Sequence, residues 1–237
     1  MKRGEAFHVK RLDELAAQYG IDAEGRDALR RLLDILASDP TAPTTVVEPE
    51  RAVDVHIADS LVALEVEAVR AAHTLADLGA GAGLPGLPLA AALPETRVVL
   101  VESVGRKAAF MRRSLEAMGL RNADVVALRA EEWRAGIGAC DVVTARALAP
   151  LNALVEYAAP LLREGGLLVA WKGHRDEAEE RDGEAAAARL GMAIEEVRRV
   201  APFEGAQARH LVLARKIAPT PPGFPRRPGM ARKRPLR

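Results

Sequence analysis

Cysteine occurs once in the 237 residues, at Cys140, which excludes a disulfide framework and a zinc site built from paired cysteines. A single thiol is typical of the reducing cytosol, so we expect a cytoplasmic location. Aromatic residues make up only 3% of the chain, which argues against a surface that stacks many nucleic-acid bases. No apolar run is long enough to cross a membrane, and we expect no membrane partner.

Charge is distributed unevenly along the chain, although the net charge is only +1. Residues 218–237 contain six basic residues, six prolines and no acidic residue, and residues 1–217 have a net charge of −5. This composition predicts a basic C-terminal tail that cannot pack into a core and is either extended or disordered. The tail is either an arm that binds nucleic-acid phosphates or a solubilising end, and composition favours neither interpretation.

Hydrophobic residues make up 49% of the chain, enough for a substantial core, and their spacing changes near residue 73. Residues 1–72 have helical spacing throughout. Residues 73–217 alternate short apolar runs with helical stretches, a pattern typical of βαβ units in a doubly wound α/β sheet. The apolar runs predict seven strands at 73–79, 96–103, 123–130, 140–147, 166–173, 192–200 and 209–216.

A glycine-rich loop, Asp77-Leu-Gly-Ala-Gly-Ala-Gly-Leu-Pro-Gly86, follows the first predicted strand and opens a helix. Such a junction lets a ligand approach the backbone at the carboxyl end of a parallel sheet. Glu102 ends the second strand, where a carboxylate can accept hydrogen bonds from both hydroxyls of an adenosine ribose.

Two cofactor classes fit this loop. Gly81, Gly83 and Gly86 form GxGxxG, which indicates a nicotinamide dinucleotide, whereas Asp77 with the glycines forms DxGxGxG, which indicates S-adenosylmethionine (SAM). A carboxylate beside the loop would repel a pyrophosphate, and this favours SAM.

The fourth predicted strand ends in Thr144-Ala-Arg146-Ala-Leu-Ala-Pro150. It carries neither the [DN]PP[YW] motif that holds an exocyclic amine nor a Pro-Cys nucleophile, and Cys140 lies at the start of the strand. If the protein is a methyltransferase, the remaining acceptor is a nucleophile such as guanine N7, which has a lone pair and no proton to remove. Catalysis would then rest on positioning and in-line approach.

The chain resembles the RsmG (GidB) family of bacterial rRNA methyltransferases over about residues 50–237. The matching segments are His56-Ile-Ala-Asp59-Ser60, the loop from Asp77 to Gly86 with Leu-Pro after it, Glu102-Ser-Val-Gly-Arg-Lys107, Arg129-Ala130-Glu131-Glu132, Thr144-Ala-Arg146-Ala147, Trp171-Lys172-Gly173 and Ala208-Arg209-His210. The Asn-Leu-Thr element that family members carry before the HxxDS helix is missing from residues 38–47.

The resemblance implies a Rossmann-like SAM methyltransferase fold: a seven-stranded, mostly parallel sheet with an antiparallel last strand, preceded by N-terminal helices. It implies SAM-dependent methylation of guanine N7 in the 530 loop of 16S rRNA, on free rRNA or the small ribosomal subunit, without metal. We expect a monomer. The residues expected to bind SAM are Asp77, Gly79, Gly81, Leu84, Glu102, Ala130, Glu131 and Arg146, and Arg146 and Lys172 are expected to place the target base.

Two other functions remain open from the sequence. One is a nicotinamide-dependent oxidoreductase, against which Asp77 and the lack of an evident Tyr-Lys proton relay argue. The other is a non-catalytic RNA-binding module that has kept the SAM fold, against which the intact glycine loop argues.

Overall fold

The computed structural model describes residues 3–206 and 208–237, with side chains from residue 8 onward. Seven strands form one sheet in the order β3-β2-β1-β4-β5-β7-β6. The strands are β1 (Thr74–Leu78), β2 (Arg97–Val101), β3 (Ala123–Val126), β4 (Cys140–Arg146), β5 (Leu162–Lys172), β6 (Met192–Val200) and β7 (Arg209–Lys216). Neighbouring strands from β3 to β5 run parallel, and β7 is antiparallel to both β5 and β6. The predicted seven-stranded sheet with an antiparallel last strand is therefore confirmed.

The helices alternate with the strands after residue 73, as the sequence predicts. They are α1 (Arg3–Tyr19), α2 (Ala23–Ser38), α3 (Pro49–Ala52), the π-helix η1 (Val53–Ala58), α4 (Asp59–Leu61), the 3₁₀ turn η2 (Val62–Glu65), α5 (Glu67–Arg70), α6 (Gly86–Ala92), α7 (Gly105–Met118), the 3₁₀ turns η3 (Ala130–Glu132) and η4 (Arg134–Gly136), α8 (Leu151–Ala158), α9 (Glu177–Arg189) and α10 (Met230–Lys233).

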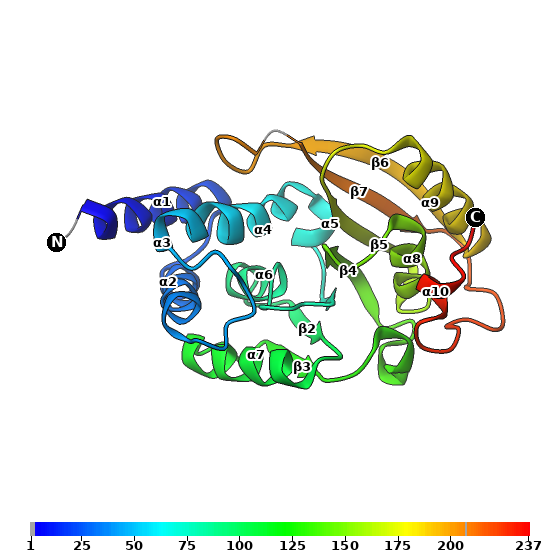
Figure 1. Cartoon of the computed structure of the whole chain (residues 1–237), viewed down its shortest axis with the longest axis horizontal. Helices are drawn as coiled ribbons and strands as arrows, with labels where there is room; N and C mark the ends of the chain where they lie inside the picture. The colour runs from blue at the N-terminus through cyan, green and yellow to red at the C-terminus, as the bar shows by residue number, and fades with distance from the viewer. Residues whose placement is uncertain (1–2, 207) are drawn as a thin grey trace.

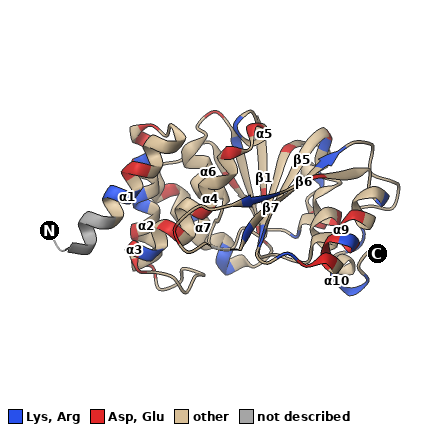
Figure 2. Ribbon diagram, turned by 90° about the horizontal axis from the view of Figure 1, so that it is seen from above, with Lys and Arg blue, Asp and Glu red and all other residues tan. Residues whose placement is uncertain are grey.

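Two hydrophobic clusters cover the two faces of the sheet, because successive strand residues point to opposite faces. Leu75, Val98 and Val142 pack with the N-terminal helices, α6 and α7. Their chain neighbours Ala76, Val99 and Val143 pack with α8, α9 and the C-terminal segment. Figures 1 and 2 show these helices on opposite sides of the sheet. The N-terminal helices thus share a core with the strands rather than forming a separate body.

Two boundaries differ from the sequence prediction. The third strand ends at Val126 instead of residue 130, because the chain turns into η3 at the edge of the sheet. The fifth strand begins at Leu162 instead of residue 166, because α8 ends at Ala158 and Leu162 already pairs with Cys140 before a bulge.

The prediction that residues 218–237 cannot pack into a core is wrong. Ala231 and Leu236 are buried in the cluster that contains α8, and Arg226 forms an ion pair with Glu156 of α8. The segment is anchored by these two apolar side chains and by the buried carboxylate of Glu156. Its high proline and arginine content gave no indication of this packing. In Figure 1 this segment, coloured red, lies beside α8 and α9.

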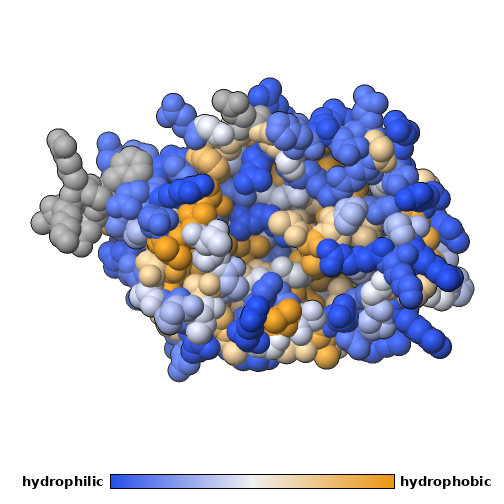
Figure 3. All heavy atoms as spheres, viewed as in Figure 1, coloured by the Kyte–Doolittle hydropathy of each residue, from blue (hydrophilic) through white to orange (hydrophobic). Residues whose placement is uncertain are grey.

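Charged and polar side chains predominate around the periphery of the face seen in Figure 3, and apolar atoms show between them. Among residues 3–206 and 208–237, no helix is long and apolar enough to cross a membrane.

Candidate active site

A pocket of about 320 Å³ lies at the carboxyl ends of the parallel strands. This is the edge at which open α/β sheets bind their ligands. Its walls come from Gly79, Val101, Glu102, Ser103, Val104, Lys107, Leu128, Arg129, Ala130, Glu131, Ala147, Leu148, Tyr157 and Arg232. A larger pocket, of about 640 Å³, lies at the opposite edge among α2, α6 and α7, away from the strand ends that carry the motifs.

The first glycine of the loop is required by its surroundings. Gly79 has a φ of +65°, and a Cβ built on it would lie 2.5 Å from Cδ1 of Leu148. A side chain at this position would suffer both backbone strain and a clash. The glycine therefore lets Leu148, which follows β4, close over the end of β1 and form one side of the pocket.

Asp77 lies beneath the loop and is completely buried. Its Oδ2 accepts a hydrogen bond of 2.9 Å from the Gly86 N–H, and its Oδ1 accepts one of 3.0 Å from the Thr144 hydroxyl. Burial raises the pKa of Asp77 to about 7. The carboxyl group thus joins the loop to β4 from below, and its side chain is not among those that line the pocket.

Glu102 directly follows β2 and lines the pocket. Its Oε2 accepts a hydrogen bond of 3.2 Å from the Gly81 N–H, and its Oε1 accepts one of 2.8 Å from the Val104 N–H. These bonds fix the carboxylate between the glycine loop and the start of α7. Each oxygen retains a second lone pair, so the group can still accept hydrogen bonds from a ligand's hydroxyls.

The pocket brings together Gly79, Glu102, Ala130 and Glu131 of the residues predicted to bind the cofactor. Asp77, Gly81, Leu84 and Arg146 are not part of this lining. The other polar residues of the lining were not predicted as site residues, namely Ser103, Lys107, Arg129, Tyr157 and Arg232. Arg232 had no local signal, because it comes from the segment expected to be extended.

Arg146, at the end of β4, lies beside the pocket and binds a buried carboxylate. Its Nη1 donates a hydrogen bond of 2.8 Å to Asp59 and one of 3.3 Å to the Val55 carbonyl. The Nε of Arg209 lies 3.2 Å from the other Asp59 oxygen. Asp59 is fully buried, whereas the side chains of Arg146 and Arg209 are 16% and 38% exposed. Two guanidinium groups share one carboxylate, so the cluster keeps a net positive charge at the strand ends.

The HxxDS segment holds this cluster against the sheet. The Trp171 indole N–H of β5 donates to the Asp59 carbonyl at 2.7 Å. The Nε2 of His56 lies 3.0 Å from both the Thr44 hydroxyl and the Val46 carbonyl, and burial lowers the pKa of His56. Thr44 and Val46 belong to the stretch that lacks the Asn-Leu-Thr element, so this loop still packs on the HxxDS segment.

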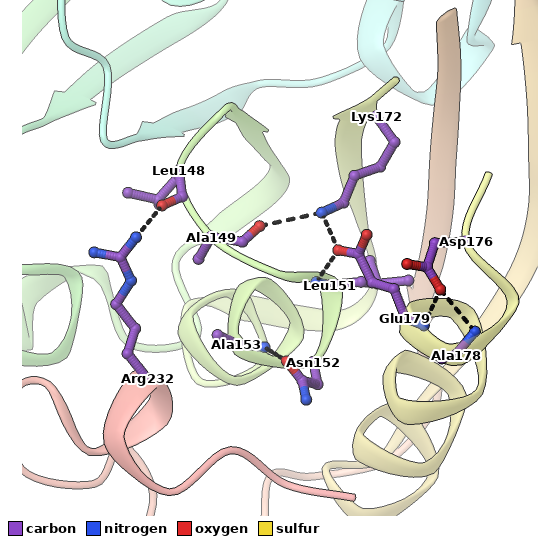
Figure 4. Close-up of polar contacts among 10 residues, drawn as sticks. All are labelled: Leu148, Ala149, Leu151, Asn152, Ala153, Lys172, Asp176, Ala178, Glu179 and Arg232. Carbon is purple, nitrogen blue, oxygen red and sulfur yellow. Dashed lines mark hydrogen bonds and ion pairs between the residues drawn. The ribbon is translucent and has the colours of Figure 1, made fainter. Parts of the chain in front are cut away.

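Lys172 ends β5 and is already paired. Its ammonium group forms an ion pair with Glu179 of α9 and donates to the Ala149 carbonyl at 3.1 Å. Figure 4 shows Lys172 and Arg232 approaching the loop after β4 from different sides; Arg232 donates to the Leu148 carbonyl at 3.0 Å. The predicted contact of Lys172 with the target stays a prediction, and the structure gives this lysine a second role in bracing the loop.

The loop that the two side chains brace begins with a strained residue. Ala147 has a φ of +53°, the only positive φ of a non-glycine residue in the described parts of the chain. Such conformations cost on the order of 1 kcal/mol or more and cluster at functional sites. The strain sets the direction of the loop between Arg146 and α8, next to the pocket.

Comparison with known proteins identifies the family of the chain. A family model described as rRNA small subunit methyltransferase G (GidB) matches residues 36–212. The chain belongs to this family. The ribosomal RNA small subunit methyltransferase G of Rubrobacter xylanophilus is 43% identical over 246 aligned residues, which cover 98% of this chain and 94% of that protein. The protein of the same name from Thermotoga neapolitana is 37% identical and covers 95% and 98% of the two chains.

Solved structures support the fold. A SAM-dependent O-methyltransferase from Thermotoga maritima has a TM-score of 0.55 at 16% identity, covering 80% of this chain and 72% of that chain. Fibrillarin from Aeropyrum pernix, with natively bound SAM, has a TM-score of 0.50 at 20% identity and covers 60% and 66%.

The family of this chain uses SAM as its cofactor, and the residues of the pocket fit that molecule. The backbone of Gly79, which carries no side chain, and the fixed carboxylate of Glu102 suit an amino-acid part and a ribose at neighbouring strand ends. Membership of this methyltransferase family decides between SAM and a nicotinamide dinucleotide as the cofactor. Asp77 by itself does not decide it, because this carboxyl group is buried beneath the loop and does not face the pocket.

Proposed function

We propose that this protein transfers the methyl group of SAM to N7 of a guanine in the 530 loop of 16S rRNA. The observation that carries the proposal is the chemistry at the end of β4. The strand delivers Arg146 to the pocket edge, and Ala147, Leu148, Ala149 and Pro150 follow without a side chain that can remove a proton. An acceptor that needs no deprotonation, such as guanine N7, suits this arrangement.

A covalent mechanism through cysteine does not fit the structure. Cys140 begins β4, at the opposite end of the strand from Arg146, and is fully buried. Burial raises the pKa of its thiol to about 12, so it is not a thiolate near neutral pH. We therefore propose direct in-line transfer, with SAM supplying an electrophilic methyl group and the protein positioning the two reactants.

The proposed roles follow from the positions of the side chains. Gly79, Glu102, Ala130 and Glu131 hold SAM, while Asp77, Gly81 and Leu84 shape the loop that supports it. Arg146 is proposed to place the target base, with Asp59 fixing its guanidinium. Lys172 is proposed to hold the loop after β4 and to bind a phosphate where RNA displaces Glu179.

The test is methyl transfer from labelled SAM to small ribosomal subunits, and separately to free 16S rRNA, purified from cells that lack the modification. The expected product is 7-methylguanosine in the 530 loop, identified by nuclease mapping and mass spectrometry. A different methylated nucleoside would overturn the choice of acceptor atom. SAM binding without transfer to either substrate would favour a non-catalytic RNA-binding module.

A further inference from the structure

The C-terminal segment 226–236 reaches both ends of the pocket. The Gly229 N–H donates to Oε1 of Glu131 at 2.9 Å, and Arg232 donates to the Leu148 carbonyl at 3.0 Å. Glu131 follows β3 and Leu148 follows β4, and the sheet places β2 and β1 between these two strands. One segment therefore spans the pocket from the end of β3 to the end of β4.

The segment is anchored on both sides of Arg232. On one side, Arg226 donates to Oε1 of Glu156 at 2.6 Å, and Glu156 is only 3% exposed. On the other side, the Asn152 amide donates to the Leu236 carbonyl at 3.0 Å, and the Leu236 side chain is buried. These anchors fix the backbone that carries Arg232, so its guanidinium is held at the pocket.

Arg232 supplies positive charge on one particular side of the pocket. The other cationic side chains of the lining, Lys107 and Arg129, follow β2 and β3. Arg232 instead binds the backbone of Leu148, whose side chain lies against Gly79 at the end of β1. Its bond to Leu148 uses one N–H of a group that has five, and the others remain for a ligand.

We propose that Arg232 is a cofactor-binding residue whose guanidinium binds the carboxylate of the amino-acid part of SAM. The inference rests on the proposed function, because it takes the amino-acid part to lie against Gly79 and the ribose to lie at Glu102. That carboxylate is the anionic group of the cofactor, and a guanidinium is its strongest side-chain partner. The C-terminal segment is then a wall of the cofactor site.

The experiment compares Arg232→Gln with Lys233→Gln, which removes the same charge from the next residue of α10. Lys233 is exposed and is not part of the pocket lining. Isothermal titration without RNA measures the Kd of SAM, of S-adenosylhomocysteine and of 5′-methylthioadenosine, which lacks the amino-acid carboxylate. Thermal unfolding of each variant verifies that it is folded.

We expect Arg232→Gln to weaken binding of SAM and S-adenosylhomocysteine about tenfold or more, the size of a lost charge-assisted hydrogen bond. Binding of 5′-methylthioadenosine should be unchanged, Lys233→Gln should bind all three ligands like the wild type, and Arg232→Lys should recover part of the loss.

Two results would overturn the inference while leaving the proposed function intact. One is equal SAM affinity in Arg232→Gln and the wild type. The other is an equal loss for 5′-methylthioadenosine, which would mean that Arg232 shapes the pocket without binding the carboxylate. Failure of the wild type to bind SAM would instead overturn the cofactor assignment, and the inference with it.

Discussion

Arg146 and Asp59 are 87 positions apart in the chain, and the guanidinium of one donates a 2.8 Å hydrogen bond to the carboxylate of the other. The bond joins the helical segment before the sheet to the strand end at which we place the target base. Asp59 is fully buried and has two arginines for partners, so its charge determines where both guanidinium groups lie.

Asp59→Asn should therefore disturb both stability and turnover. Removing one member of a buried ionic cluster leaves the others uncompensated, and we expect a loss of about 3 kcal/mol in the free energy of unfolding, measured in urea. Methyl transfer should fall more than SAM affinity, because the cluster lies outside the pocket lining. Asp13→Asn, which breaks an exposed ion pair with Arg26, is the control and should change stability by less than about 1 kcal/mol.

Gly79→Ala should abolish high-affinity SAM binding. Its control is Gly165→Ala, because Gly165 also has a positive φ, +80°, but its added Cβ would meet no atom within 4 Å. Both variants should lose about 1 kcal/mol of stability from left-handed backbone strain. Only Gly79→Ala also displaces Leu148, so only it should raise the Kd of SAM, by at least about tenfold. Equal SAM affinities for the two variants would contradict this account of the loop.

Asp77 should make the stability of the protein depend on pH. Its pKa is about 7 in the fold and about 3.9 in the unfolded chain, so between these values only the folded protein holds the proton. The contribution of Asp77 to the free energy of unfolding is therefore fully present below pH 4 and is lost as the pH rises to 7.

Asp77→Asn removes that dependence. The free energy of unfolding of Asp77→Asn minus that of the wild type should increase by on the order of 2 kcal/mol from pH 5 to pH 8. Urea unfolding at both pH values measures this difference. Asp124→Asn, at an exposed position, serves as the control. A constant difference between Asp77→Asn and the wild type across this range would show that Asp77 does not titrate there.

Arg226→Gln should destabilise the whole protein although it lies near the C-terminus. The substitution leaves the buried Glu156 carboxylate without its partner, and we expect a loss of about 3 kcal/mol in the free energy of unfolding. Arg227→Gln changes the neighbouring, exposed residue and should stay within about 0.5 kcal/mol of the wild type. Equal free energies of unfolding for Arg226→Gln and Arg227→Gln would show that the ion pair with Glu156 contributes nothing to stability.

Much of the fold is predictable from the sequence because the parallel strands are buried on both faces. The run Val98-Val-Leu-Val101, for example, is apolar without interruption, and this distinguishes it from the helices on either side. The mostly parallel sheet with an antiparallel last strand follows from the resemblance to the family, and the site at the carboxyl edge follows from the glycine loop.

The parts that the sequence did not predict depend on contacts between distant residues. Nothing in the sequence near Arg226 indicates that it pairs with the buried Glu156, 70 positions away. Nothing near Lys172 indicates that it donates to the Ala149 carbonyl, 23 positions away. Asp77 was expected beside the ligand because of its motif, and only the packing of Gly86 and Thr144 around it shows that it lies below the loop.

The braces on the loop after β4 both end on backbone carbonyl oxygens, those of Leu148 and Ala149. A carbonyl oxygen is present whichever side chain a residue carries, so exchanging Ala149 for another residue keeps the Lys172 bond available. The architecture thus separates the path of the loop from the identity of its side chains. Mutation can therefore change the side chains that the loop after β4 presents to the substrate without changing the path of its backbone.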